Sequence, residues 1–159
     1  METNTLTIMG FDLYGLKATS EKGAYFRNNI WWWRPLAGYV LENVDIPEAQ
    51  AKHWQYNDGI TVSEKLTLRI ADTLEKLIAQ GQTQQYEQEY KQALAALPDE
   101  VCVICKGQGV RNDEYVKGTC NGCNGTGRVP NFMKHYPFDV ENVKEFAQFC
   151  RDSGGFTIC

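Results

Sequence analysis

Four of the six cysteines in this 159-residue chain occur as two closely spaced pairs. Each pair has the spacing Cys-x-x-Cys, and fourteen residues separate the two pairs. A Cys-x-x-Cys turn directs two thiolates at one ion, and two such turns supply the four sulfurs of a tetrahedral zinc site. We therefore expect one structural zinc ion, bound by Cys102, Cys105, Cys120 and Cys123. Four thiolates leave no open position for water, so a catalytic zinc is not expected.

Both cysteine pairs continue into the same glycine-rich pattern, Cys-x-x-Cys-x-Gly-x-Gly, at 102–109 and 120–127. Glycine adopts positive φ at little cost, so the chain can curl around each sulfur pair and aim backbone N–H groups at the thiolates. An iron–sulfur centre satisfies the same ligand count and stays an alternative. Redox-active pairs are a further alternative, although such pairs usually begin a helix. The two histidines, His53 and His135, are not needed as ligands.

The doubled motif resembles the cysteine-rich domain of the DnaJ (Hsp40) co-chaperones. That family carries four repeats and two zinc ions, so this chain resembles half of the domain with one zinc ion. The resemblance covers about residues 100–130, and it implies a zinc-bound β-hairpin module that contacts polypeptide. The sequence has no His-Pro-Asp tripeptide, so stimulation of an Hsp70 ATPase is not implied.

Three consecutive tryptophans followed by an arginine form a second feature with recognition chemistry. Three consecutive side chains cannot all face one core on a helix or a strand, so at least one indole should be partly exposed. Such an indole beside arginine could stack on a base, hold a phosphate or anchor a peptide. The expected partner-binding residues are Trp31, Trp32, Trp33, Arg34 and Arg27. In the alternative, two indoles fill the core and the third covers a loop.

Three segments, 9–15, 25–36 and 142–156, resemble small uncharacterised proteins of bacteriophages and prophages. This resemblance implies no activity. It implies a viral accessory protein that acts in the cytoplasm of a bacterial host.

Composition argues against several classes of protein. Sixteen Lys and Arg against twenty Asp and Glu give a net charge of −4, whereas a general nucleic-acid coat needs a clustered basic surface. No apolar run approaches the roughly 20 residues that span a bilayer, so no membrane association is expected. The first residues lack a basic start and an apolar stretch, which favours the cytoplasm over export. Whether Met1 or Met9 starts the natural chain stays open.

No pattern typical of an enzyme is present, because the sequence lacks a P-loop, a strand followed by Gly-x-Gly-x-x-Gly, and His-Glu-x-x-His. We expect a non-enzymatic, zinc-stabilised binding protein whose partner is another protein. A nucleotide- or nucleic-acid-binding anti-defence factor and an Hsp40-like polypeptide-binding fragment are the alternatives. The metal segment itself argues against DNA, because its net charge with zinc and four thiolates is only about +1.

Hydrophobic periodicity predicts an α+β fold that is mainly α, with a small helical body and a few short strands. The cysteine motif and its resemblance to the DnaJ domain imply an inserted zinc-bound β-hairpin module. The expected strands cover 5–13 and 156–159, and residues 28–33 fit either a helix or a strand. Five helices are expected. The first begins near Arg34 with Pro35 in its first turn, and the second covers 47–54. The third follows a capping box at Thr61–Glu64 and ends at Gly81, the fourth spans 83–97, and the fifth runs from the cap at Asp139 through Cys150. The apolar stripe of the last helix makes Cys150 a core residue. The body would comprise 1–98 plus 131–159, with the zinc module at 99–130.

Overall fold

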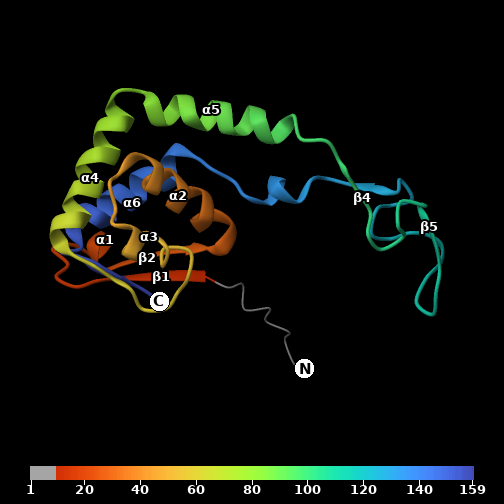
Figure 1. Cartoon of the computed structure of the whole chain (residues 1–159), viewed down its shortest axis with the longest axis horizontal. Coiled ribbons are helices and arrows are strands. Elements are labelled where there is room, and N and C mark those ends of the chain that lie inside the picture. Colours follow the sequence, from red (N-terminus) through yellow and green to blue (C-terminus); the bar gives the residue numbers. More distant parts are fainter. Residues whose placement is uncertain (1–9) are drawn as a thin grey trace. The chain divides into compact units, whose positions relative to one another are not determined.

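The computed structural model describes residues 10–159, which fold as two compact units (Figure 1). The first unit comprises the chain up to Tyr90 together with Tyr136–Cys159, and the second is Lys91–His135. The fold is α+β and mainly α, as the sequence predicts. Part of the strand expected at 5–13, and the possible start at Met9, lie outside the described residues.

The first unit contains a four-stranded antiparallel sheet in the order β2-β1-β8-β3. Its strands are β1 (Gly10–Gly15), β2 (Tyr25–Asn29), β3 (Thr61–Val62) and β8 (Phe156–Ile158). Phe11 and Leu13 of β1 are buried, whereas Tyr14 is exposed, because successive side chains of a strand point to opposite faces. The predicted final strand is confirmed, and it lies inside the sheet between β1 and β3.

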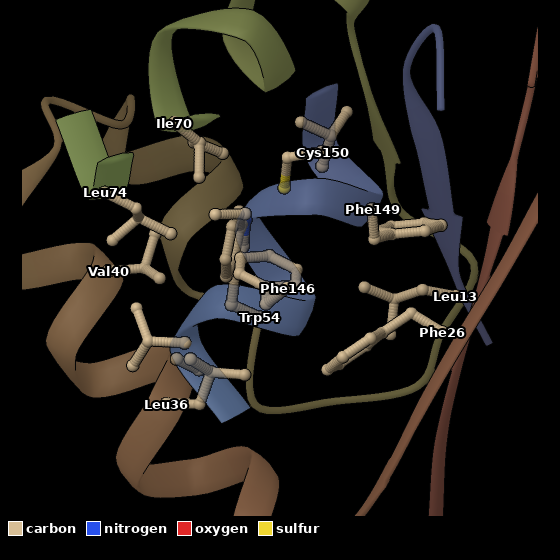
Figure 2. Packing of buried hydrophobic residues seen from close by; sticks show 14 of the residues in the cluster. Leu13, Phe26, Leu36, Val40, Trp54, Ile70, Leu74, Phe146, Phe149 and Cys150 are labelled. Carbon is tan, nitrogen blue, oxygen red and sulfur yellow. The ribbon is translucent and has the colours of Figure 1, made fainter. Parts of the chain in front are cut away.

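The helices of the described chain are α1 (Glu21–Ala24), α2 (Ile30–Asn43), α3 (Glu48–Ala51), α4 (Glu64–Ala79), α5 (Gln82–Ala95) and α6 (Val140–Asp152). Of these, α1, α2 and α6 contact the sheet, and α4 packs on α6. Figure 2 shows Phe146 and Cys150 of α6 among side chains from α2, α4 and the sheet. Cys150 is fully buried, which confirms its place in the core. The whole predicted stripe of α6 is buried, and Asp139 caps that helix by accepting from the Asn142 N–H at 2.8 Å.

The helix expected to begin near Arg34 begins four residues earlier, at Ile30. Asn29 is its N-cap, and the side-chain oxygen of Asn29 accepts from the Trp32 N–H at 3.1 Å. Pro35 therefore lies in the second turn, where it cannot donate to the carbonyl of Trp31. Residues 28–33 are part strand and part helix, because β2 runs to Asn29 before α2 begins.

The cap of α4 also differs from the expectation, since Ser63 takes the place predicted for Thr61. The Ser63 hydroxyl accepts from the Leu66 N–H at 3.3 Å, while Thr61 pairs with Thr157 in the sheet. The predicted end of the helix is confirmed, because the chain turns at Gly81 with φ +74°. The next helix, α5, buries Thr83 and partly buries Tyr86 and Tyr90 against the core.

The second unit is built from two small antiparallel ribbons. Its strands are β4 (Glu100–Val101), β5 (Val110–Asn112), β6 (Lys117–Thr119) and β7 (Arg128–Val129), in the pairs β4-β7 and β5-β6. The segment expected to be a linker contains a 3₁₀ helix, Phe132–His135. The buried cluster of this unit consists of the four paired cysteines, with Val129 packed against them.

In the part of the chain that the structure describes, no helix has both the length and the apolar character needed to cross a membrane.

Candidate metal centre

The four paired cysteines converge on one point of the second unit. Their sulfur atoms all lie within 4.8 Å of one another, and each residue is at most 6% exposed. The sulfurs of Cys105 and Cys123 are 3.7 Å apart. A tetrahedral ion with metal–sulfur bonds of about 2.3 Å places its ligands about 3.8 Å apart. The four thiols are therefore spaced to hold one metal ion.

The two cysteine hooks have the same backbone structure, displaced by eighteen residues. In the first hook the Gly107 N–H donates to the Cys102 carbonyl at 3.1 Å, and in the second the Gly125 N–H donates to the Cys120 carbonyl at 3.1 Å. Each cysteine pair is thus held by its own turn, and the repeat of the sequence is a repeat of the structure.

The hooks also bond to each other. The Cys102 N–H donates to the Gly127 carbonyl at 2.9 Å, and the Cys120 N–H donates to the Gly109 carbonyl at 2.9 Å. These reciprocal bonds place the first cysteine of one hook beside the last glycine of the other. The metal-binding arrangement therefore depends on both halves of the repeat at once.

Backbone N–H groups point at two of the sulfurs, as the glycine pattern predicts. The N–H of Gly109 donates to the sulfur of Cys105 at 3.2 Å, and the N–H of Gly127 donates to the sulfur of Cys123 at 3.2 Å. Both glycines have positive φ, +74° and +73°. This backbone conformation is the one that glycine adopts without a steric penalty.

These hydrogen bonds favour the thiolate form of the ligands. Burial raises the pKa of the Cys123 thiol, but the N–H of Gly127 and the neighbouring Cys105 outweigh burial and lower the pKa to about 6. Burial likewise opposes ionisation of Cys105, yet the N–H of Gly109 lowers its pKa below the ordinary value. Burial dominates at Cys120 and raises its pKa. Metal ions bind thiolates rather than thiols, so two ligands are prepared for binding.

The donor set suits a soft, tetrahedral ion such as zinc. Neither cysteine pair precedes an α-helix, in contrast to the redox-active arrangement, because each is followed by residues with positive φ such as Lys106 and Asn124. His53 instead places Nδ1 2.6 Å from a carboxylate oxygen of Asp58, and His135 stacks edge-on with Phe132. Among the described residues, potential ligand atoms converge only at the four cysteines.

The tryptophan run lies in three different environments rather than on one surface. Trp33 is fully buried, and its Nε1–H donates to the Trp54 carbonyl at 2.6 Å. Its ring stacks with Phe11 at a centroid distance of 5.4 Å. The expectation that Trp33 contacts a partner is therefore corrected, because its indole fills the core between α2 and the sheet.

Trp31 and Arg34 contact Tyr136, in a group that we call the Tyr136 clasp and that also includes Tyr90. The rings of Trp31 and Tyr136 have centroids 5.0 Å apart, and Nη1 of Arg34 donates to the Tyr136 hydroxyl at 3.3 Å. The Tyr90 hydroxyl donates to the Tyr136 carbonyl at 2.7 Å. Tyr90 and Tyr136 are the residues between which the second unit is inserted. The clasp thus joins the two ends of the insertion within the first unit.

Trp32 and Arg27 lie apart from this clasp. Trp32 is half-buried and lines a pocket with Asn28 and Asn142, whose side-chain amides bond to each other at 2.8 and 3.0 Å. Arg27 is exposed and pairs with Asp12 at 3.1 Å, beside a hydrogen bond from the Tyr25 hydroxyl to the same carboxylate. Partner binding by Trp31, Trp32, Arg34 and Arg27 stays a prediction.

The sequence matches no family model, no curated protein and no solved structure. The resemblances to the DnaJ cysteine-rich domain and to phage proteins therefore rest on the quoted motifs alone.

Proposed function

We propose that this protein is a non-enzymatic, zinc-stabilised binding protein that contacts another protein through its second unit. Cys102, Cys105, Cys120 and Cys123 would hold the zinc ion, which would supply a structural cross-link and no catalytic position. The observation that carries the proposal is the distribution of exposed apolar side chains.

Exposed apolar side chains are concentrated in the second unit. Of the twelve large hydrophobic residues that are exposed in the described chain, seven belong to the 45 residues of that unit. They are Val101, Val103, Ile104, Val110, Tyr115, Phe132 and Met133. Clustered exposed apolar surface on a small unit is typical of interaction sites.

The metal site does not require an apolar residue at position 103. The first hook carries Val103 and Ile104 between its cysteines, while the second carries Asn121 and Gly122 at the same positions. Both hooks nevertheless have the same hydrogen bonds. Because Val103 is 85% exposed, it adds little to the fold of the unit, and a binding role explains it better.

A capture experiment tests the proposal. Zinc-loaded protein would be immobilised and exposed to bacterial lysate, since the phage resemblance favours a bacterial host partner. We expect Val103→Ser with Tyr115→Ser to abolish capture of the specific partner, because these residues are 85% and 82% exposed. Tyr56→Ser is the matched control, since Tyr56 is 63% exposed but belongs to the first unit.

The opposite pattern would contradict the proposal. If Arg34→Ala removed the partner while the Val103 and Tyr115 changes did not, binding would belong to the Trp31–Arg34 segment. Nucleotide or nucleic acid released from the purified protein would favour the alternative class of ligand.

A further inference from the structure

One groove of the second unit lies beside its metal centre. It has a volume of 480 Å³ and is lined mainly by apolar side chains from β4, the first hook, β7 and the 3₁₀ helix. Val101 and Phe132 line it and are each 51% exposed. Val103, Val129 and Pro130 complete its apolar part. The groove therefore presents partly exposed apolar side chains beside the metal centre.

The strand beside this groove has an unpaired edge. β4 and β7 pair so that Glu100 faces Val129, and the Cys102 N–H donates to the Gly127 carbonyl. Hydrogen-bonded pairs alternate along an antiparallel ribbon, so the N–H and carbonyl of Val101 point away from β7. The ribbon contains only these two strands within the described chain, and no strand pairs with that edge.

The other edge of the same ribbon is closed by a side chain. The hydroxyl of Thr126 accepts from the Arg128 N–H at 3.2 Å, and its oxygen lies 2.8 Å from the carbonyl oxygens of Arg128 and Cys123, which share its one proton. The outward N–H of β7 therefore has a local side-chain partner. Within residues 10–159, Val101 has no comparable partner, and its backbone groups lie next to the groove that its side chain lines.

Charge indicates what kind of segment fits. Among the described residues that line the groove, the ionisable side chains are one carboxylate, Glu100, and one imidazole, His135, with no lysine or arginine. The Phe132 N–H donates to Glu100 at 3.3 Å, which holds the carboxylate at the groove.

We infer that the groove binds an extended, apolar segment of a partner protein with basic residues at its flank, and that the segment adds as a strand to the free edge of β4. This inference rests on the proposed function, because it assumes that the second unit is the protein-binding part. Main-chain bonds to Val101 supply affinity, the apolar lining selects alternate side chains, and Glu100 favours the basic flank.

Binding by this route depends on the metal. The ribbon is joined to the centre through Cys102, whose N–H bonds across to Gly127 while its thiol is a ligand. Removal of zinc should separate β4 from β7 and thereby disrupt the groove. A chelator is therefore expected to abolish binding.

The test uses full-length, zinc-loaded protein and a short fluorescein-labelled peptide of alternating leucine and threonine flanked by lysines. Fluorescence anisotropy should show saturable binding that is weaker for the same peptide flanked by glutamates. Val101→Ser and Phe132→Ala should each weaken binding about tenfold, the effect of losing one buried apolar contact. Val110→Ser and Met133→Ala are matched controls with similar exposure, 57% and 51%, outside the groove lining.

A second measurement reports strand addition directly. In ¹⁵N-labelled protein the amide of Val101 should become protected from hydrogen exchange when the lysine-flanked peptide binds. Zinc content confirms that each variant keeps its metal centre.

Two results would overturn the inference. These are the absence of peptide binding to zinc-loaded protein, and equal weakening by the groove and control substitutions. If either occurred while Val103→Ser with Tyr115→Ser still abolished partner capture, the groove would be wrong and the proposed function would stand. If peptide binding were absent and the Val103→Ser and Tyr115→Ser changes also left partner capture unaffected, the proposed function would be wrong as well.

Discussion

At the scale of single residues, the glycines of the hooks are as necessary as the cysteines. A side chain at position 127 would place its Cβ 2.3 Å from the Gly107 carbonyl oxygen, and one at 109 would lie 2.4 Å from the Gly125 carbonyl oxygen. Real Cβ atoms essentially never approach so closely, so the hooks would have to separate. The N–H groups of Gly109 and Gly127 also donate to the sulfurs of Cys105 and Cys123, which couples this backbone to the candidate metal site.

Gly127→Ala should therefore weaken zinc binding, as measured by competition with a chromogenic chelator. Gly118→Ala is the matched control, because Gly118 also has positive φ, +115°, but a Cβ there meets nothing within 4 Å. The control should cost only about 1 kcal/mol of backbone strain and leave zinc affinity unchanged. Equal zinc affinities for the two variants would show that the close approach is not needed.

Trp33 supports a second prediction at this scale. Trp33→Ala should lower the free energy of unfolding by about 3–5 kcal/mol, the usual cost of truncating a large buried aromatic residue. The change also leaves the Trp54 carbonyl without its donor. Arg34→Ala, at an exposed position, should cost less than about 1 kcal/mol. Urea denaturation measures both, and similar losses would contradict the assignment of Trp33 to the core.

The cysteine pKa values predict how the centre responds to acid. The pKa of Cys123 is lowered to about 6, so folding favours its thiolate, and that contribution is complete above the ordinary thiol pKa. It is lost as the pH falls through about 6, when protons compete with the metal. A fluorescent zinc indicator should therefore detect release below pH 6 and retention at pH 7. Release already complete at pH 7 would contradict this.

At the scale of elements, the sequence predicted those helices and caps that are determined by a local pattern of residues. The stripes of α4 and α6 repeat with the helical period, and the Asp139 cap lies next to its helix, so these features were predictable. The start of α2 was not, because the Asn29 cap and the pairing of β2 outweigh the disfavoured position of Pro35. The Tyr136 clasp joins residues about a hundred positions apart, and no local sequence pattern predicts such a contact.

The clasp leads to a prediction about the insertion. Replacing 102–127 by a short glycine–serine linker should leave a helical first unit that unfolds cooperatively, because Tyr90 and Tyr136 hold the ends together and loop length costs little. Circular dichroism during urea denaturation measures this. The same replacement combined with Tyr90→Phe should be less stable, since that change removes the donor to the Tyr136 carbonyl. Loss of helical signal in the simple replacement would show that the insertion is part of the core.

At the scale of the whole molecule, the two units are stabilised by different means. The first buries a continuous aromatic and aliphatic core, whereas the buried cluster of the second consists of cysteines. A unit of 45 residues buries too little apolar surface to fold alone without a cross-link, and a metal ion bound by the four cysteines would supply the missing free energy. The cysteine spacing predicted the centre from sequence, while the exposure of Val101 and Phe132 beside it became evident only from the fold.

The central claim is that one structural zinc ion holds the second unit together. Elemental analysis of protein purified without added metal, normalised by amino-acid analysis, tests it most directly. We predict a zinc ratio near one per chain, falling to near zero when Cys102 and Cys120 are both replaced by serine. Iron in place of zinc, or a ratio near zero with the four cysteines joined in disulfides, would contradict the account.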